Sequence, residues 1–448
     1  MRRGNWRKRS IRPSARPTAG PVTTGPASSN ARLTRTRRQR ETASLEGIKV
    51  VDVSQVAAVP LASRLLADFG ADVIHVEHPL RGDSWREFQA GQGAGTAGAP
   101  SPINYNWENY NRNKRSLTLD LSQEQGREIM HRLLKDADVL LTNLRSFEKV
   151  KFGLEYSAVS KLNPRLVYAS LFGYGKYGPD KDAPGYDQTA YWHRAGIPYV
   201  LSWPGELPPC FQTAFGDNVA ALALAFGVMT ALYRREKTGA GQEVDLSLFQ
   251  MGVFVNAFNI GGALTTGKEY EEWRRHAPEE SPNPLSNIYL TGDGRWLNMV
   301  MLQSDRYWTK FCQAIGHEEM EKDPRFDSFA TRKENHVELF HVLEEIMLTK
   351  PLREWITVMT AAGLPIAPMQ SLQEVIHDPQ AEANNFFPTF DHPTYGPLKI
   401  IANPLNFSED PATIRTPAPE LGQHTEEVML ELGYDWEDIG KLKDDHII

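Results

Sequence analysis

The chain has 448 residues, of which 41% are hydrophobic and 23% charged, a globular composition that excludes a disordered or fibrous protein. Its two cysteines, Cys210 and Cys312, exclude a disulfide scaffold, an iron–sulfur protein and a cysteine-rich zinc module, and they fit a reducing, cytoplasmic location. No uncharged run reaches the ~20 residues that cross a bilayer, so we expect no membrane partner. Beyond residue 40 there are 37 basic and 56 acidic residues, which argues against nucleic acid as the main partner.

The first 40 residues have a different composition, with 12 arginines and lysines and no acidic residue. We expect residues 1–44 to be a disordered basic arm or a leader, and the fold to begin at about Leu45. Arg- and Ser-rich, acid-poor segments are also typical of mitochondrial transit peptides, which would make the location mitochondrial. The prolines at positions 13, 17, 21 and 26 interrupt the amphipathic helix of such a peptide.

From residue 47 onward, strand and helix patterns alternate. A β-branched run over 48–53, helical apolar spacing over 61–69 and a second β-branched run over 71–77 predict one βαβ unit with parallel strands. Further strands are predicted at 116–121, 138–143 and 165–172, and helices at 122–136 and 156–162. Ser122 and Gln125 have the spacing of a capping box for the first of these helices. The pattern predicts an α/β fold with an open, doubly wound, mostly parallel sheet.

The second half of the chain predicts the rest of this fold and a smaller α/β domain. A helix over 218–233 is apolar all round and should be buried, followed by a strand at 242–245 and a helix at 246–258. A charged linker leads to a β-hairpin at 287–301, whose turn is Gly-Asp-Gly at 292–294. Helices are predicted near 306–315, 333–347 and 425–432, and a strand at 398–401. The predicted domains are 45–267 completed by 390–448, and a linker with a small domain at 268–389.

Several common site motifs do not occur in the sequence. The first strand–helix turn, residues 54–60, contains no glycine, so a nicotinamide dehydrogenase of the usual kind is not expected. The twelve histidines form no H-E-x-x-H motif, and no thiolate set exists for a structural zinc, so no metal site is predicted. No G-x-S-x-G motif anchors a hydrolase triad.

The segment Phe215-Gly216-Asp217, directly before the apolar helix, has two interpretations. Asp217 could be an ordinary N-cap of a helix that begins near Asn218. Alternatively, the helix N-terminus lies inside the molecule, where free N–H groups and the helix dipole favour an ionised carboxylate. A partly desolvated carboxylate of that kind could serve as a nucleophile.

An ordered set of motifs resembles the class III CoA-transferases, a family that includes the formyl-CoA:oxalate and carnitine CoA-transferases and α-methylacyl-CoA racemase. The resemblance covers Leu45 to the C-terminus. It rests on Leu-Glu-Gly-Ile-Lys-Val-Val-Asp-Val-Ser from position 45, Leu-Ala-Asp-Phe-Gly-Ala-Asp-Val-Ile-His-Val-Glu-His-Pro from 66, Asn-Lys-Arg-Ser-Leu-Thr-Leu-Asp-Leu from 113, Gly-Tyr-Asp from 185, Phe-Gly-Asp from 215 and Lys-Thr-Gly-Ala-Gly-Gln from 237.

The resemblance implies transfer of CoA from an acyl-CoA thioester to a free carboxylic acid, through a covalent intermediate on Asp217. It implies no permanently bound cofactor, with the CoA thioester as substrate, and a homodimer of interlocked chains in which the strand near Leu398 rejoins the N-terminal sheet. His78 and Ala57 depart from residues found in some members. The positions that the resemblance assigns to CoA binding are Gln55, Ala57, Ala58, His78, Leu119, Asn143, Leu144, Lys151 and Tyr186.

Two alternatives to a transferase remain open. A racemase of the family would pair Asp187 with a histidine in the preceding strand, but residues 167–171 contain none. A non-catalytic CoA-binding protein would not need the Gly-Asp pair at 216–217, so the presence of this pair argues against that alternative. For a transferase, the segments from Tyr186 and from Asn283 resemble enzymes of cinnamoyl-type and 2-hydroxyacyl substrates, so we expect a larger acid than oxalate or formate. Aromatic residues that either pack the core or line an acyl pocket are Tyr186, Tyr191, Trp192, Tyr199, Trp203 and Phe211.

Overall fold

The computed structural model describes residues 43–87, 101–203, 206–209, 214–268 and 277–448. The basic arm up to residue 42, Cys210 and Phe211 lie outside the described residues, so the expectations about them stay untested. In the described chain, Leu45 is buried and its backbone N–H donates to the carbonyl of Phe69.

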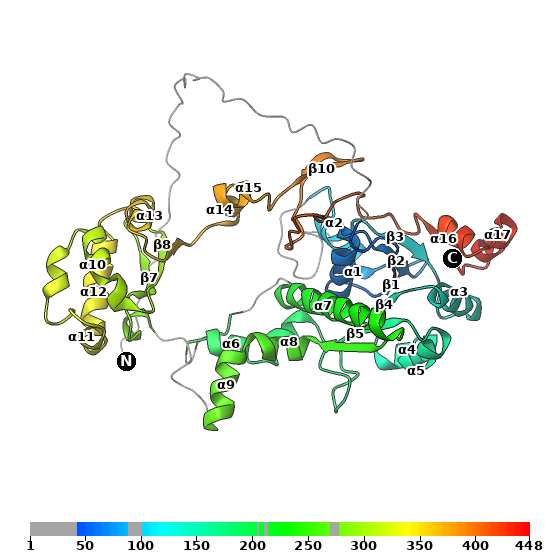
Figure 1. The fold of residues 1–448 in the computed structure, drawn as a ribbon, viewed down its shortest axis with the longest axis horizontal. Coiled ribbons are helices and arrows are strands. Elements are labelled where there is room, and N and C mark those ends of the chain that lie inside the picture. The colour runs from blue at the N-terminus through cyan, green and yellow to red at the C-terminus, as the bar shows by residue number, and fades with distance from the viewer. Residues whose placement is uncertain (1–42, 88–100, 204–205, 210–213, 269–276) are drawn as a thin grey trace, which may run out of the picture. The chain divides into compact units, whose positions relative to one another are not determined.

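A six-stranded sheet, parallel throughout, forms the centre of the larger part of the chain (Figure 1). The strand order is β3-β2-β1-β4-β5-β6, so the chain reverses its direction of winding between β1 and β4. This is the predicted doubly wound sheet, and such a reversal is where α/β proteins place their ligands. The strands are β1 (Lys49–Val53), β2 (Asp72–Glu77), β3 (Arg115–Thr118), β4 (Val139–Thr142), β5 (Val167–Phe172) and β6 (Glu243–Ser247).

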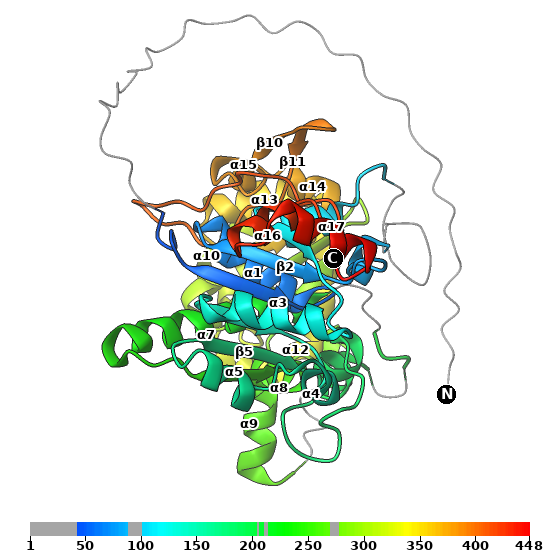
Figure 2. The ribbon, with the colours of Figure 1, turned by 90° about the vertical axis from the view of Figure 1, so that its right-hand side faces the viewer.

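Successive residues of the strands alternate between two hydrophobic cores, as the pleat of a sheet requires. Val50 packs in the first core, with the helices α1 (Ala58–Asp68), α7 (Phe215–Thr238) and α8 (Leu248–Val255). Val51 packs in the second core, on the opposite face, with helices that lie in front of the sheet in Figure 2. These are α3 (Glu124–Lys135), α5 (Tyr156–Leu162), α16 (Thr425–Glu431) and α17 (Trp436–Asp444).

Several helices differ from their predicted bounds or were missed. The helix α3 begins at Glu124 with Gln123 as N-cap, so the capping box at Ser122 was wrong. The predicted helix over 246–258 breaks at Asn256 into α8 and α9 (Ala257–Thr266), which meet at a bend of 78°. The sequence patterns missed helices that include α4 (Ser146–Phe152), α17 and the short elements η1 (Ser84–Arg86), α2 (Tyr105–Asn111), η2 (Asp187–His193) and α6 (Ile197–Leu201).

The helix α7 is longer than predicted and is not buried all round. It runs for 24 residues and ends where Gly239 takes a left-handed conformation. One face packs on α1 and the sheet, whereas Phe226 and Tyr233 on the other face are 75% and 65% exposed. Among the described residues, α7 is long and apolar enough to cross a membrane, and so is the α8–α9 pair if counted as one bent span. Core helices of soluble proteins meet the same criterion, so this is weak evidence for a membrane segment.

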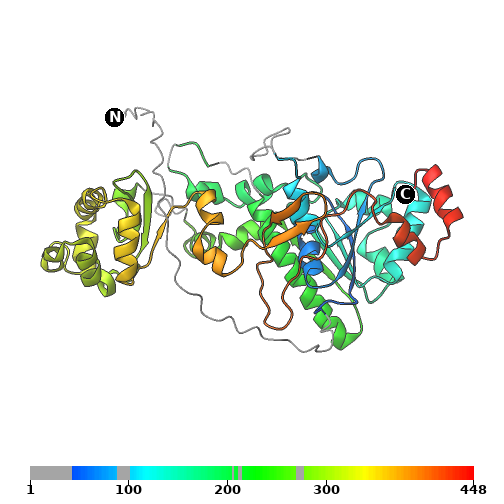
Figure 3. The same ribbon diagram turned by 90° about the horizontal axis from the view of Figure 1, so that it is seen from above.

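The region after the linker has its own sheet and its own hydrophobic core. The predicted hairpin is confirmed, because β7 (Ser286–Leu290) pairs with β8 (Trp296–Val300), and β9 (Ile366–Pro368) adds a third antiparallel strand. Helices, yellow in Figure 3, cover one side of these strands. They are α10 (Ser304–Ile315), α11 (Phe329–Glu334), α12 (His336–Met347) and α13 (Leu352–Ala361), with the turn η5 (Glu318–Lys322) between the first two and η4 (Pro278–Glu280) before the hairpin.

The prediction that the strand near Leu398 rejoins the N-terminal sheet was wrong. After α14 (Leu372–Ile376) and α15 (Pro379–Ala383), β10 (Thr389–His392) pairs antiparallel with β11 (Gly396–Lys399), and Leu398 lies opposite Phe390 in this two-stranded ribbon. The run at 398–401 is apolar enough to form a strand, but its backbone hydrogen bonds go to the nearby β10 rather than to the large sheet. Side chains instead join the following segment to α1, since Asn403 donates to the buried carboxylate of Asp68.

Candidate active site

The turn between β1 and α1 is held at two adjacent residues. Gln55 exchanges two hydrogen bonds with the side chain of Asn143, one from its N–H (3.1 Å) and one to its carbonyl (2.8 Å). Val56 has a φ of 72°, a left-handed conformation that is rare for a β-branched residue. Its N–H donates to Asp83, at 3.0 Å to Oδ1 and 3.2 Å to Oδ2. Polar side chains, rather than glycines, therefore fix the shape of this turn.

A cleft of about 450 Å³ opens beside this turn, at the carboxyl ends of β1, β2, β3 and β4. Of the nine predicted CoA-binding residues, it is lined by Gln55, His78, Leu119, Leu144 and Lys151. An adjoining hollow of about 330 Å³ shares two of these residues with the cleft and adds two more, Asn143 and Tyr186.

The structure therefore brings seven of the nine predicted residues together. The other two, Ala57 and Ala58, are 2% and 3% exposed at the start of α1, and their side chains line neither hollow.

Asp217 lies in the first turn of α7, but the N-cap interpretation does not hold. The helix begins at Phe215, and its N-cap Ala214 makes no side-chain bond. The backbone N–H groups of Gly216 and Asp217 donate to the carboxylate of Asp187, at 3.0 Å from the Asp217 nitrogen. The N–H groups at the start of α7 are thus bonded to Asp187 rather than to Asp217, and the Asp217 side chain is half-buried.

The expectation that this position favours an ionised Asp217 was also wrong. Burial, followed by the negative charge of Asp187, raises the pKa of Asp217 to about 7. Burial also raises the pKa of Asp187, against hydrogen bonds from the two N–H groups and from the Trp192 indole (3.0 Å). Two carboxyl groups with raised pKa values side by side are typical of a catalytic site.

Gly216 makes this arrangement possible, because a side chain at this position would have no space. A Cβ placed there would overlap both the ring of Tyr191 and the carboxylate of Asp187. The glycine thus lets α7 begin directly against η2, the element that carries both of those residues.

Two aromatic residues that the sequence did not single out connect the cleft to α7. The Tyr110 hydroxyl donates to Asn218 Oδ1 at 2.7 Å, beside Asp217. Burial and the charge of Asp217 raise the pKa of Tyr110 to about 12. The ring of Trp85, from η1 beside the turn, meets the ring of Tyr110 edge-on at 5.8 Å. No sequence motif includes Tyr110, and the only signal for it in the sequence is its position in a run of polar and aromatic residues.

The aromatic residues between Tyr186 and Asp217 divide between core and surface. Tyr191 is buried in the first core, as the packing interpretation expected. Trp192 bonds to Asp187 and meets the exposed ring of Phe215 edge-on at 6.1 Å. Tyr186 and Tyr199 are 67% and 43% exposed. In the part of the chain that the structure describes, no cluster of three or more histidine, cysteine or acidic side chains is arranged to hold a metal ion.

Comparisons with known proteins agree with the fold and the site. A model of CoA-transferase family III matches residues 45–425. The chain is 36% identical to the (R)-2-hydroxy-4-methylpentanoate CoA-transferase of Clostridioides difficile, over 90% of this chain and 99% of that one. It is 32% identical to the cinnamoyl-CoA:phenyllactate CoA-transferase of Clostridium sporogenes, over 91% and 98% of the two chains. The crystal structure of a CAIB/BAIF family protein from Brucella suis matches with a TM-score of 0.74 and 29% identity, over 88% of this chain and 100% of that one.

The parallel sheet with its cleft at the strand reversal is that of an α/β enzyme. The match to the family model and to full-length relatives shows the family of this enzyme: the chain belongs to CoA-transferase family III. It is therefore a CoA-transferase, which moves CoA between an acyl-CoA substrate and an acid.

Proposed function

We propose that Asp217 is the nucleophile of this CoA-transferase and that the reaction passes through a covalent aspartyl intermediate. The observation that carries the proposal is the site at the start of α7, where burial and Asp187 raise the pKa of Asp217 to about 7. A carboxylate with that pKa is still ionised in part at neutral pH, and it is more basic, and therefore more nucleophilic, than an ordinary aspartate.

The proposed chemistry conserves the thioester without ATP. The Asp217 carboxylate attacks the thioester carbonyl of the donor, which forms a mixed anhydride and releases the CoA thiolate. The thiolate attacks the aspartyl carbonyl, which frees the donor acid and leaves an aspartyl-CoA thioester. The acceptor carboxylate attacks this thioester, which forms a second mixed anhydride with Asp217 and releases the CoA thiolate again. The thiolate then attacks the acceptor acyl carbonyl, which gives the acceptor acyl-CoA and regenerates the Asp217 carboxylate. Water must be kept from the anhydride, because it would hydrolyse it.

We propose that the cleft at the carboxyl ends of β1 to β4 holds CoA. Its lining holds three basic side chains, His78, Arg81 and Lys151, beside four acidic ones, and the basic side chains can bind the phosphate groups of the nucleotide. The apolar side chains of Leu119 and Leu144 suit the adenine ring. The adjoining hollow, which reaches Tyr186, would receive the pantetheine arm.

The acceptor is proposed to be a branched or aromatic acid, including 2-hydroxy acids. Two similar enzymes carry (R)-2-hydroxy-4-methylpentanoate and phenyllactate in their names. In this chain, Trp192 and Phe215 place two aromatic rings beside Asp187, and each buried methylene adds about 0.8 kcal/mol to binding. We therefore expect kcat/KM for 2-hydroxy-4-methylpentanoate or cinnamate to exceed that for formate by roughly tenfold or more.

A second copy of the chain is the proposed partner of the exposed apolar face of α7 and of the exposed apolar side chains of α9. This face is continuous along α7, with exposed side chains at spacings of three and four residues. An exposed apolar surface of this kind marks an interaction site. We propose a homodimer whose two chains interlock, with residues 45–267 and 390–448 forming the CoA-binding domain. The exposed residues are Leu222, Phe226, Met229, Tyr233, Phe258 and Leu264.

The test replaces Asp217 and follows the covalent step. Asp217→Ala should melt like the wild type, bind CoA and lose transfer by orders of magnitude, whereas Asp444→Asn, an exposed carboxylate of α17, should leave transfer unchanged. Hydroxylamine added with an acyl-CoA should label Asp217 as a hydroxamate that mass spectrometry locates.

Transfer by Asp217→Ala at the wild-type rate would overturn the proposal. A wild type that binds CoA but transfers it to none of the acids would instead favour a non-catalytic protein. Solvent deuterium entering the α-carbon without an acceptor acid would favour a racemase.

A further inference from the structure

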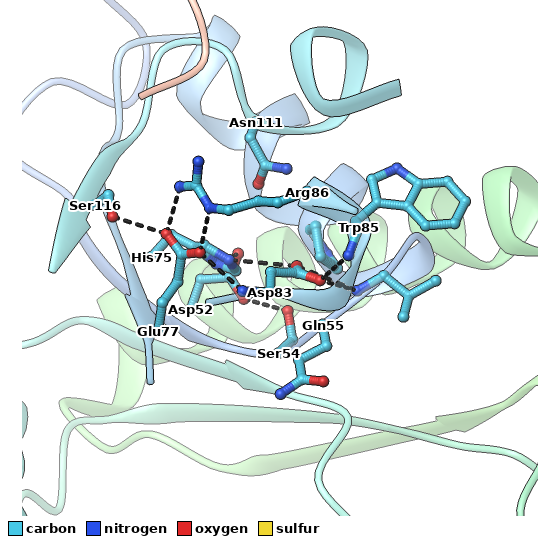
Figure 4. A network of polar contacts seen from close by, with 12 residues as sticks. Asp52, Ser54, Gln55, His75, Glu77, Asp83, Trp85, Arg86, Asn111 and Ser116 are labelled. Atoms are coloured by element: carbon cyan, nitrogen blue, oxygen red, sulfur yellow. Dashed lines mark hydrogen bonds and ion pairs between the residues drawn. The ribbon is translucent and has the colours of Figure 1, made fainter. Parts of the chain in front are cut away.

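A cluster of polar side chains, all of them 2% exposed or less, lies next to the turn at Gln55 and Val56, and Figure 4 shows Asp52, His75 and Asp83 of this cluster. We call it the His75 cluster. Asp52 and His75 are paired neighbours in the adjacent strands β1 and β2, so they stand in the middle of the sheet. Its members are Asp52, Ser63, His75, Asp83 and Lys114.

The ring of His75 stands between two carboxylates. Its Nδ1 is 3.1 Å from Asp52 Oδ2, and its Nε2 is 3.5 Å from Asp83 Oδ2. Lys114 Nζ is also 3.1 Å from Asp52 Oδ2, and Ser63 donates to the same oxygen at 2.6 Å. With His75 protonated on both nitrogens, the cations of His75 and Lys114 balance the anions of Asp52 and Asp83. With neutral His75, the cluster would hold an unbalanced buried negative charge, which is costly.

The surroundings of His75 support the imidazolium form. Burial and Lys114 lower its pKa, but Asp52 and Asp83 outweigh them and raise the pKa of His75 to about 9. On the same strand, Glu77 adds a further negative charge, and from α2 the indole of Trp107 lies with its centroid 5.9 Å from the imidazole.

Asp83 connects this cluster to both sides of the proposed CoA cleft. Its carboxylate accepts the N–H of Val56 and, at 2.8 Å, the N–H of Trp85 at the start of η1. Its own N–H donates to Glu77 at 2.9 Å. The same carboxylate thus holds the CoA-side turn and the element whose Trp85 ring contacts Tyr110 next to Asp217.

The left-handed Val56 makes the turn depend on this carboxylate. A β-branched residue keeps such a conformation only where the surrounding structure holds it. The two oxygens of Asp83 that accept the Val56 N–H keep Val56 in this conformation. His75 is the cation that faces Oδ2 of this carboxylate. Loss of the charge on His75 would free Asp83 to move, and Gln55 would move with Val56.

We propose that His75 is a positioning residue for acyl-CoA binding: as a buried cation between Asp52 and Asp83, it fixes the turn that forms one wall of the cleft. The inference rests on the proposed function, because it assumes that CoA occupies this cleft. His75 touches neither the substrate nor the reacting atoms. Its effect should therefore fall on the KM for acyl-CoA rather than on kcat.

The experiment measures CoA affinity by calorimetry, and kcat and KM for an acyl-CoA donor, in four proteins. His75→Gln removes the cation and should raise KM by roughly tenfold, equivalent to about 1.4 kcal/mol, while kcat changes little. His75→Lys restores a cation and should recover most of the affinity. His392→Gln is the matched control: His392 is also buried, with its Nε2 3.5 Å from Glu108, but it lies outside the cleft. It should leave KM unchanged.

The KM of the wild type measured over a series of pH values gives a second readout. It would not change with the charge of His75 if the role of this residue were purely structural. The imidazolium is present below the pKa of about 9 and lost above it, so KM should rise as the pH passes 9. His75→Lys replaces the imidazolium by an ammonium and should show a smaller rise over the same range. Lys114, whose pKa burial lowers, is the same in both proteins, so the comparison isolates position 75. The comparison needs no folded His75→Gln, so it tests the proposal even if that variant fails to fold.

Each outcome has one meaning. A folded His75→Gln with wild-type KM, or a wild-type KM that stays flat through pH 9, overturns the positioning role. An equal rise in KM in His392→Gln also overturns it, since the effect would then reflect general loss of stability. A wild type that neither binds CoA nor transfers it would refute the proposed function instead.

Discussion

The charge of Asp187 should contribute to the pH at which this enzyme becomes active. Burial and Asp187 together raise the pKa of Asp217 to about 7, and the proposed attack of Asp217 on a thioester requires its carboxylate form. A group with a pKa of 7 is about 9% ionised at pH 6 and about 91% at pH 8, so the wild-type rate should rise roughly tenfold over that interval.

Replacing Asp187 by asparagine removes one of the two causes of the raised pKa. The amide oxygen can still accept the N–H groups of Gly216 and Asp217, so the start of α7 should persist. The pKa of Asp217 should fall, so a larger fraction of the group is ionised at pH 6. The ratio of the rates at pH 8 and pH 6 should then be smaller than in the wild type.

The assay is the initial rate at saturating acyl-CoA between pH 5.5 and 8.5, for the wild type and Asp187→Asn. An amide at 187 also disturbs the bond from Trp192, whose Nε1 donates to Asp187. Trp192→Phe removes that bond and keeps the charge, so it should retain the wild-type midpoint. The reasoning would be refuted by a midpoint in Asp187→Asn equal to or above that of the wild type, or by a wild-type rate that does not change between pH 6 and 8.

Two further predictions concern stability. Gly216→Ala places a Cβ against the Tyr191 ring, so the melting temperature should fall with a loss of about 1–3 kcal/mol, and an unchanged melting curve would contradict the contact. Asp68→Asn leaves Arg64 and Arg112 as buried cations without their partner, and the urea midpoint should fall by the equivalent of about 3–5 kcal/mol. Against burial, the two arginines lower the pKa of Asp68. The wild type should therefore lose this stability as the pH falls below the usual carboxyl range, and the variant should not.

The large sheet could be predicted because its signals are local. The strands over Lys49–Val53 and Asp72–Glu77 are short β-branched runs, and the helix between them shows clear apolar spacing. The role of Asp217 and the predicted CoA-binding positions came from the resemblance, since a lone Gly-Asp pair also fits an ordinary helix start. The strand near Leu398 was misplaced because an apolar run indicates a strand but not its partner.

The rest of the site depends on contacts between distant residues, which no local pattern reports. Asp187 and Asp217 are 30 positions apart, and Tyr110 and Asn218 are 108 apart. One signal was available but unused: a polar side chain in a strand that is buried on both faces. His75 is such a side chain, and a buried histidine needs partners.

Helices α16 and α17, which complete the cover of the second core, follow all six strands of the sheet in the chain. Met429 of α16 and Leu442 of α17 are buried in that core, and the carbonyl of Ile447 accepts the N–H of Asp120 beyond β3 at 2.7 Å. A chain emerging from the ribosome therefore carries a partly uncovered apolar sheet face until these two helices have been made. A chain cut short before them would present that part of the face to chaperones or to aggregation.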